Sequence, residues 1–364
     1  MGNTTSNDNN VDAQQISDLQ QQLKTKDTQI SNLQSVINNF ERVEDQTISQ
    51  CKKDLDYENL VIEGGGTKGI AYCSAVEELE KMGILENIKR YAGSSAGAIT
   101  AALLAVGYDA AEAREIVANT NFGEFLDDKF GYIRDAYKML TDFGMCSGVI
   151  FHKFMKNKIK AKTGDANYTF SKLYKQHKIE LVITGTDLTT METKYYCRQN
   201  TPYMPIADAV RISMSIPYLF VPMEYHKSFL VDGGMIDNYP IHVFDGAYPG
   251  DPLAKTGQVP VNPRTLGLKI LTPDENISYK LVDHDNKIDG IKSFTLSLVN
   301  TLMIANERRY VTPQNWQRTA VIKVPNIPLT KFDLSPEEIQ QLLTAGSKGI
   351  KDYFELGDEP QPVI

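Results

Sequence analysis

Strand and helix signals alternate along the chain from Tyr57 onward, and this alternation restricts the fold more than any other feature of the sequence. Leu60-Val61-Ile62 is a short apolar run followed by glycines, which is typical of a buried parallel strand. Residues 68–82 then have helical spacing, and the pattern repeats. The alternation predicts a three-layer α/β domain over residues 57–357, with a mainly parallel central sheet and helices on both faces. Further strands are expected at residues 91–92, 181–185, 195–197, 229–231, 266–271 and 320–324, and further helices at 96–106 and after Ser335.

The first 56 residues have a different texture. Residues 1–15 are rich in Asn, Asp, Gln, Ser and Thr, and we expect them to be disordered. From Ile16 to Phe40 apolar residues recur at alternating spacings of three and four over four heptads, with Lys26 as the one polar residue in the seam. This narrow stripe predicts a self-associating coiled coil, although an amphipathic helix packed on the chain's own core would show the same spacing. Residues 41–56 are expected to be a charged linker, and residues 358–364 a tail.

Composition and charge exclude several classes of protein. The sequence has 38 basic and 46 acidic residues, a net charge of −8, and this argues against a nucleic-acid partner. No apolar run approaches the roughly 18 residues needed to cross a bilayer, and the N-terminus lacks the pattern of a secretory signal. The four cysteines lie outside metal-ligand spacing of one another, so we expect reduced thiols in a cytoplasmic protein.

Three glycine-bearing motifs each follow a predicted strand, and in open α/β sheets ligands bind where strands end. The first is Gly64-Gly65-Gly66-Thr67-Lys68-Gly69. It contains the dinucleotide pattern G-x-G-x-x-G, but the second strand ends at Tyr91-Ala92-Gly93-Ser94, without the carboxylate that would bind a ribose. Exposed backbone N–H groups at a helix start also bind anions, and in a hydrolase they would face an oxyanion. A tight turn without a ligand is the remaining interpretation.

The second motif is Gly93-Ser94-Ser95-Ala96-Gly97, which has the G-x-S-x-G pattern of a nucleophile elbow. In such an elbow the flanking Gly93 and Gly97 permit a strained turn that lifts the Ser95 hydroxyl clear of the sheet. An apolar helix follows, and its N-terminal dipole would favour negative charge at Ser95. The position between a strand and a helix therefore makes Ser95 the candidate nucleophile.

The third motif is Asp232-Gly233-Gly234, followed by Asn238-Tyr239-Pro240. A lone D-G-G sequence is usually a turn, but a serine hydrolase needs a base. His242 and His284 are the histidines that follow Asp232, and His242, which we expect at the entry to a helix, is more readily interpreted as structural. A carboxylate within hydrogen-bond reach also accepts a serine proton.

Taken together, these motifs resemble the patatin-like phospholipases, lipid acyl hydrolases that use a Ser–Asp dyad without histidine. The resemblance is clear over about residues 57–245 and includes a fourth segment, residues 213–222, similar to the family pattern S-x-x-x-P-x-x-F-x-P. It implies a patatin-like fold, Ser95 as nucleophile, Asp232 as base, and Gly64 to Gly69 as the oxyanion loop. The chain departs from the family at Lys68, where arginine is usual, and lysine lacks the planar guanidinium that makes a bidentate contact.

The resemblance also implies the reaction. Asp232 would accept a proton as Ser95 attacks an acyl ester, the N–H groups near Gly65 and Gly66 would hold the oxyanion, and water would resolve the acyl-enzyme. No cofactor or metal is required. The expected substrate is a phospholipid or lysophospholipid, met at a membrane surface to which the protein binds peripherally.

The N-terminus offers a route to that membrane. Gly2 and Ser6 fit the N-myristoylation pattern, but residues 1–56 contain five basic and nine acidic residues instead of a polybasic patch. Self-association through the coiled coil would present several acyl groups at once. Residues 122–145 are a candidate cap over the site, and residues 285–311 are expected to be a core helix or an interfacial one.

Three other functions remain open at this point. The same dyad would suit a soluble carboxylesterase or a triacylglycerol lipase, which would cleave short esters but not vesicles. A nucleotide-binding module would use residues 64–69, and an inactive scaffold would use only the coiled coil. The presence of both Ser95 and Asp232 argues against the scaffold.

Overall fold

The computed structural model of the chain describes residues 8–120, 122–125, 143–251, 253, 259–272, 288, 290, 294, 297–299, 301–302, 312–328 and 331–355, with side chains from Gln15 onward. The chain divides into two compact units, residues 1–47 and 48–364. The structure therefore places most of the predicted α/β domain in the second unit. The expected terminal segments 1–7 and 358–364, and most of 122–145 and 285–311, lie outside the described residues.

A single helix, α1 (Asp8–Asp54), contains the predicted coiled-coil segment. It continues through the expected linker because no glycine or proline occurs between its ends. The seam side chains that the structure describes are exposed along the helix: Ile16, Leu19, Leu23, Ile30, Leu33, Ile37 and Phe40. From Ile48, which is buried, the last turns of α1 belong to the second unit.

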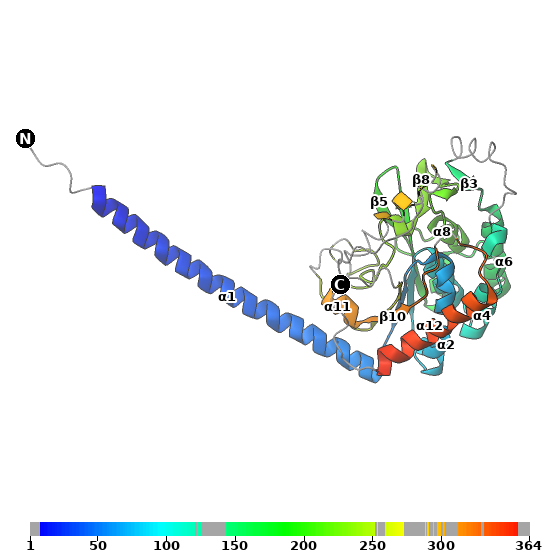
Figure 1. Cartoon of the computed structure of the whole chain (residues 1–364), viewed down its shortest axis with the longest axis horizontal. Helices are drawn as coiled ribbons and strands as arrows, with labels where there is room; N and C mark the ends of the chain where they lie inside the picture. Colours follow the sequence, from blue (N-terminus) through cyan, green and yellow to red (C-terminus); the bar gives the residue numbers. More distant parts are fainter. Residues whose placement is uncertain are drawn as a thin grey trace, which may run out of the picture. The chain divides into compact units, whose positions relative to one another are not determined.

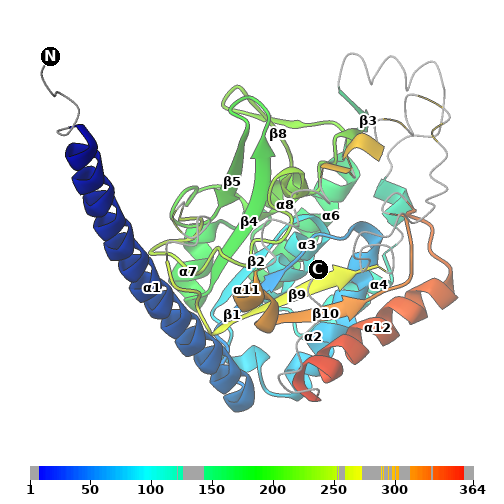
Figure 2. The same ribbon diagram turned by 60° about the vertical axis from the view of Figure 1, so that its left-hand side comes forward.

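The central sheet is mixed, with a parallel core and an antiparallel end (Figures 1 and 2). Strands β10, β9, β1, β2 and β4 run parallel in that order, whereas β5 and β8 pair antiparallel with β4, and β7 with β8. A separate parallel pair joins β3 to β6. The strands are β1 (Asn59–Ile62), β2 (Arg90–Gly93), β3 (Gly144–Cys146), β4 (Glu180–Asp187), β5 (Glu192–Tyr196), β6 (Tyr218–Phe220), β7 (Met223–Tyr225), β8 (Ser228–Asp232), β9 (Thr265–Leu271) and β10 (Thr319–Lys323).

Strand register brings two of the glycine motifs together. β2 lies along residues 180–183 of β4, with Gly93 opposite Ile183, whereas β8 lies along residues 185–187, with Asp232 opposite Gly185. The two strands run in opposite directions, so each ends near the same point of β4: their last residues, Gly93 and Asp232, pair with β4 residues that are two positions apart. Chain segments that are about 140 residues apart in sequence thus meet at the carboxyl edge of the parallel core.

Helices pack on one face of the sheet in the largest hydrophobic cluster, which includes Leu60 and Ile62 of β1. Residues of the opposite face, Val61 among them, pack against the segment from Tyr239 to Phe244. The helices are α2 (Ala71–Lys81), α3 (Ser95–Ala105), α4 (Ala110–Ala118), α6 (Val149–Thr163), α7 (Phe170–His177), α8 (Ile206–Ser213), α11 (Pro313–Gln317) and α12 (Pro336–Glu355), with short 3-10 turns η1 (Gly66–Ile70), η2 (Leu85–Asn87), η3 (Phe122–Phe125) and η4 (Gly233–Met235).

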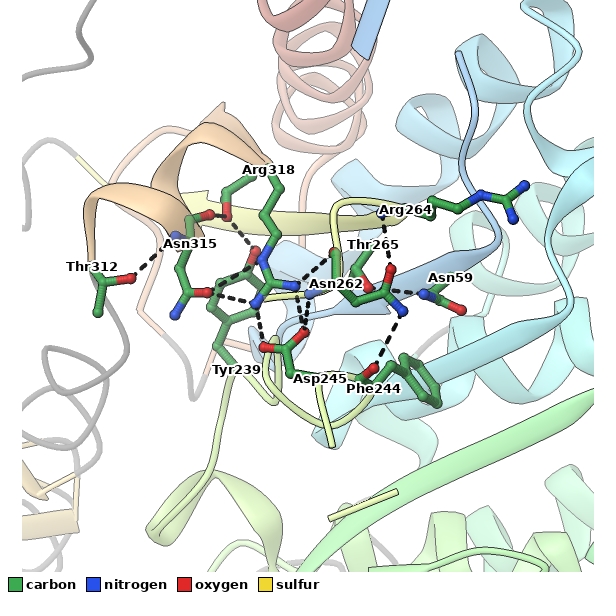
Figure 3. Close-up of polar contacts among 11 residues, drawn as sticks. Asn59, Tyr239, Phe244, Asp245, Asn262, Arg264, Thr265, Thr312, Asn315 and Arg318 are labelled. Carbon is green, nitrogen blue, oxygen red and sulfur yellow. Dashed lines mark hydrogen bonds and ion pairs between the residues drawn. The ribbon is translucent and has the colours of Figure 1, made fainter. Parts of the chain in front are cut away.

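A buried ion pair anchors the segment that covers the second face (Figure 3). The fully buried Arg318 guanidinium pairs with Asp245 through two hydrogen bonds, Nη1 to Oδ1 at 2.6 Å and Nη2 to Oδ2 at 2.5 Å. Asn315 Oδ1 accepts a further bond from Nη2 at 2.6 Å, and the Tyr239 hydroxyl lies 2.7 Å from Thr319 Oγ1. The contacts fix the chain that follows Asp232 to the start of β10.

The local expectations have clear outcomes. The predicted capping box of the last helix is confirmed, because Ser335 N donates to Glu338 Oε2 at 2.9 Å and Glu338 N to Ser335 Oγ at 3.2 Å. The first domain helix begins at Ala71, after the turn η1, and not at residue 68. His242 was expected to enter a helix, and this is wrong: it lies in a turn at the second face of the sheet. None of the four cysteines, all of which the structure describes, forms a disulfide bond.

Candidate active site

Ser95 lies at the sharp turn between β2 and α3, in the conformation of a nucleophile elbow. Its φ of +48° is in the left-handed region, which residues with a side chain seldom adopt. The glycines on either side are required by close packing, since a Cβ on Gly93 would lie 2.5 Å from the Gly97 backbone and one on Gly97 would lie 2.3 Å from Ile62 O. The turn places Ser95 at the N-terminus of a buried helix, whose dipole favours negative charge there.

Asp232 ends β8, and its side chain is fully buried. One carboxylate oxygen, Oδ1, accepts the Gly234 N–H at 2.7 Å, whereas Oδ2 has no hydrogen-bond partner among the described residues. Burial raises the pKa of this carboxyl from its ordinary 3.8 to about 7, while the Gly234 N–H and the Ser95 hydroxyl lower it in part. A carboxyl with this pKa is close to half-ionised at neutral pH, which suits a general base.

The two side chains that the sequence singled out are therefore neighbours. The Ser95 hydroxyl is near enough to affect the pKa of Asp232, but its hydrogen-bond contact of acceptable geometry is with the Met214 sulfur, 3.7 Å away. In the resting site the hydroxyl contacts the Met214 sulfur, and catalytic hydrogen bonds often tighten only when substrate binds. The packing is tight around the pair, since a Cβ on Gly233 would meet Thr184 Oγ1 at 2.1 Å and Ser94 Oγ at 2.8 Å.

The glycine loop passes directly beside Ser95. A Cβ on Gly64 would lie 3.0 Å from the Ser95 Cβ and 2.2 Å from Asn238 Oδ1. The Gly64 N–H is already used, because it donates to Asn238 O at 3.1 Å, and no described residue accepts a hydrogen bond from the N–H of Gly65 or Gly66. These two donors are therefore available to an anion beside Ser95.

Asn238 holds the glycine loop in place. Besides accepting from Gly64 N, it donates its own side-chain Nδ2 to Gly64 O at 3.1 Å. From the sequence alone, Asn238 is only part of the segment that follows the third motif, and no contact with the glycine loop could be predicted for it. The structure assigns it a contact that joins the third motif to the first.

The segment at the end of α8 supports both Ser95 and Asp232. Ser213 Oγ accepts the Ser95 N–H at 2.9 Å, and Ser215 O accepts the Asp232 N–H at 2.9 Å. The segment is similar to a family pattern, but nothing in the sequence indicates a role for either serine. Backbone positions of the two candidate catalytic residues are thus fixed by one short stretch of chain.

Arg211, one turn before Ser215 on α8, is a buried residue that the sequence reasoning missed. Its Nη2 donates to Ser147 O at 2.7 Å and to Val221 O at 3.0 Å, its Nε to Gly148 O at 3.1 Å, and its Nη1 to Ser215 Oγ. The planar guanidinium is therefore a clamp on the segment that carries Ser215.

Two lysines lie near the glycine loop in different settings. Lys269 forms a buried ion pair with Glu63, the residue directly before Gly64, and Glu63 Oε2 also accepts the Ile270 N–H at 2.8 Å. Lys68 is also largely buried, but no described residue forms an ion pair with its ammonium group. The Glu63–Lys269 pair could not be predicted from the sequence, because its members are about 200 residues apart.

In the described part of the chain, His242 and His152 contact residues other than Ser95 and Asp232. His242 Nε2 lies 3.2 Å from the Tyr195 hydroxyl and 3.6 Å from Asp237 Oδ2, and His152 Nε2 lies 2.7 Å from Asp208 Oδ1. His284 is outside the described residues. Among the described residues, no group of three or more His, Cys, Asp or Glu side chains is arranged to hold a metal ion. No helix in this part of the chain is both long enough and apolar enough to span a membrane.

Known proteins resemble this chain in sequence and in fold. Residues 60–245 match the family described as patatin-like phospholipase. An uncharacterized protein of Acanthamoeba polyphaga mimivirus is 30% identical over 81% of this chain and 93% of its own length. A probable lipid hydrolase of Invertebrate iridescent virus 6 is 25% identical over 51% of this chain and 63% of its own length.

The fold has a solved counterpart in VipD from Legionella pneumophila, with a TM-score of 0.53 and 18% identity over 83% of this chain and 67% of VipD. The family match covers half of the chain and includes all three glycine motifs. The chain therefore belongs to the patatin-like phospholipases, a family of lipid acyl hydrolases.

Proposed function

We propose that the protein is a serine acyl hydrolase that cleaves fatty-acyl esters of phospholipids or lysophospholipids, with Ser95 as nucleophile and Asp232 as general base. The observation that carries the proposal is the fully buried Asp232 carboxyl, whose pKa is about 7 and whose Oδ2 is left without a partner among the described residues beside Ser95. The name of the iridescent virus relative, a probable lipid hydrolase, supports the substrate class.

The proposed reaction has two halves. Ionised Asp232 takes the Ser95 proton on Oδ2 as Ser95 Oγ bonds to the ester carbonyl carbon. The tetrahedral intermediate then breaks its bond to the leaving alcohol, which departs with the proton from Asp232, and the acyl group stays on Ser95. Water attacks the acyl-enzyme, again losing its proton to Asp232, and the free fatty acid leaves as Ser95 regains its proton.

The backbone N–H groups of Gly65 and Gly66 stabilise the oxyanion in both halves. They need no rearrangement to do so, because Asn238 already fixes the loop at Gly64. Such preorganised donors are worth several kcal/mol when charge develops on the carbonyl oxygen. The N-terminal dipole of α3 adds to this stabilisation.

Hydrolysis of a lipid panel tests the proposal. The panel contains lysophosphatidylcholine, phosphatidylcholine vesicles, triacylglycerol emulsion and a short soluble ester. We expect the protein to release fatty acid from the first two, and Ser95→Ala and Asp232→Asn each to lose at least about 10³-fold in rate. Normal turnover by either variant would refute the dyad, and activity on the short ester alone would identify a soluble carboxylesterase.

We further propose that the protein self-associates through α1. In heptad terms, isoleucine occupies three of the four a positions of the exposed seam (16, 23, 30 and 37), and leucine occupies two of the four d positions (19, 26, 33 and 40). Isoleucine at a with leucine at d favours parallel two-stranded coiled coils. Analytical ultracentrifugation of Ile30→Asp, which places a charge in the seam, should give monomers where the parent gives dimers. A parent that is monomeric throughout the micromolar range would refute it.

The third proposal concerns location. We propose that the protein is cytoplasmic and reaches membranes peripherally, aided by N-myristoylation of Gly2, which lies outside the described residues. Paired α1 helices would present two acyl chains together, and two signals bind a membrane far better than one. Fractionation of eukaryotic cells should find Gly2→Ala more soluble than the parent. Equal distribution of the two proteins would exclude this role.

A further inference from the structure

Exposed apolar side chains lie beyond the candidate active site on three segments: the β4–β5 turn, the start of β8 and the residue directly before β3. We propose that these residues, Phe143, Leu188, Met191 and Phe229, here named the apolar tip, insert into the surface of a zwitterionic phospholipid bilayer and so place Ser95 at the membrane. The inference rests on the proposed function, because it specifies how an enzyme of this kind reaches a lipid in a bilayer.

The strand register places Leu188 and Phe229 of the apolar tip beyond the same edge of the sheet as the catalytic pair. Asp232 pairs with Gly185 and Leu230 with Asp187, and one step further Leu188 N donates to Phe229 O at 2.9 Å. At about 3.3 Å per residue, Phe229 stands about 10 Å beyond Asp232 along β8. In Figure 2 strands β4, β5 and β8 extend past the ends of β1 and β2 in this direction.

The apolar tip exposes more hydrophobic surface than a loop end requires. Met191 is 82% exposed and Phe229 36%, and Leu188 and Phe143 are exposed as well. The rings of Phe143 and Phe229 contact each other edge to face with centroids 5.9 Å apart, so residues from two separate segments form one cluster. Clustered apolar side chains at a surface usually mark a protein or membrane contact.

The backbone beneath the tip is held rigidly. Asp187 Oδ1 accepts the N–H of Thr189 at 2.9 Å and that of Thr190 at 3.3 Å, and Thr189 Oγ1 accepts the Phe229 N–H at 3.1 Å. These bonds connect the β4–β5 turn to β8. Because the turn and the strand are held to each other, little conformational entropy is lost when Leu188, Met191 and Phe229 enter a bilayer.

The charges around the tip favour a zwitterionic surface over an anionic one. Lys194 is paired with Glu192 at 3.1 Å and with Asp187 at 3.7 Å, so its charge is largely compensated. Acidic residues outnumber basic ones by three to two in residues 187–194 and 223–229: Asp187, Glu192 and Glu224 against Lys194 and Lys227. A surface of this kind gains nothing from the negative potential of anionic lipids.

Tyr225 and His226, with ring centroids 4.3 Å apart, supply amphipathic rings of the type found at membrane interfaces.

Vesicle flotation with the full chain tests the proposal. The test variant combines Leu188→Ser with Met191→Asn, since asparagine tolerates the positive φ of 58° at residue 191. The matched control is Tyr203→Ser, which removes a side chain that is 83% exposed in the connection before α8. Two versions of each protein are made. The version with Ser95→Ala is used for flotation, so that binding is measured without hydrolysis, and the version with native Ser95 is used for rate measurements.

We expect the test variant to bind phosphatidylcholine vesicles at least about tenfold more weakly than the parent and the control, because two apolar side chains no longer enter the bilayer. Hydrolysis of vesicles should fall by a similar factor, whereas hydrolysis of a short soluble ester stays at the parent rate.

Parent-like vesicle binding by the test variant would overturn the proposal. So would stronger, salt-dependent binding to phosphatidylglycerol vesicles, or light scattering in which the parent self-associates and the test variant does not. If the parent cleaves neither vesicles nor the short ester, the proposed function fails, while flotation still decides the docking surface.

Discussion

Replacing Asp232 by asparagine should stabilise the folded protein at alkaline pH while it removes activity. The carboxyl is fully buried, and burial raises its pKa from 3.8 to about 7. Asparagine has nearly the same shape and keeps an oxygen to accept the Gly234 N–H, but it carries no charge. Above pH 7 the parent must fold around a buried carboxylate, and the variant does not.

The size of the effect follows from the two pKa values. A pKa raised from 3.8 to about 7 corresponds to a cost of about 4 kcal/mol for the ionised form in the folded state. Because the folded state binds the proton more tightly than the unfolded state, the cost is nearly absent below pH 4. It grows as the pH rises to about 7, and then levels off. At pH 5 it is only about 1–2 kcal/mol. The stability gained by the variant should therefore be about 2–3 kcal/mol larger at pH 8 than at pH 5.

Urea unfolding of the parent and of Asp232→Asn at both pH values, followed by the fluorescence of the single tryptophan, measures this difference. Contributions from other titrating groups cancel in the comparison. Asp165→Asn is the control, because a hydrogen bond from Lys172 lowers the pKa of that half-buried carboxyl, so the loss of its charge gives no gain in stability at pH 8. If the stability difference between parent and Asp232→Asn is the same at pH 5 and pH 8, the carboxyl titrates as an ordinary surface acid and the reasoning fails.

Three further predictions concern the site. For a short soluble ester, kcat/KM should rise with pH and reach half its maximum near pH 7, because Asp232 acts as a base only when ionised; a flat profile from pH 5 to 9 would contradict this. Gly64→Ala should lower kcat at least about 100-fold, with an unchanged melting temperature as evidence of folding, because its Cβ would lie 2.2 Å from Asn238 Oδ1 and displace the loop that supplies oxyanion donors. Arg211→Met should lower the unfolding free energy by about 3 kcal/mol or more in urea titrations, since several buried acceptors lose their donor, and Arg211→Lys should not restore it.

Much of the fold is encoded locally and was predictable for that reason. The apolar runs of the parallel strands, the helix after Ser95 and the capping box at Ser335 depend on neighbours in sequence, and the structure confirms them. The antiparallel direction of the strands around β4 was less predictable. Strands were expected at residues 195–197 and 229–231, but the pairing of β8 with β4 joins segments about 45 residues apart, and the local sequence carries no signal for strand direction.

The candidate site shows the same division. Ser95 and the glycines around it stand out because a strained turn demands particular residues at fixed spacing. Ser213, Asn238 and Arg211 act through hydrogen bonds to backbone atoms that are distant in sequence, and a serine, an asparagine or an arginine in a sequence does not reveal such a partner. His242 shows the converse, because a residue type suited to catalysis is here bonded to Tyr195.

Covalent labelling tests the central claim most directly. A fluorophosphonate with a fatty-acyl-like chain forms a stable bond with an activated serine and imitates the tetrahedral intermediate. We predict that peptide mass spectrometry finds one adduct, on the peptide that contains Ser95, and that labelling slows at least about 100-fold in Asp232→Asn. An adduct on another residue, or equally fast labelling when Asp232 is replaced, would contradict the assignment of these two residues.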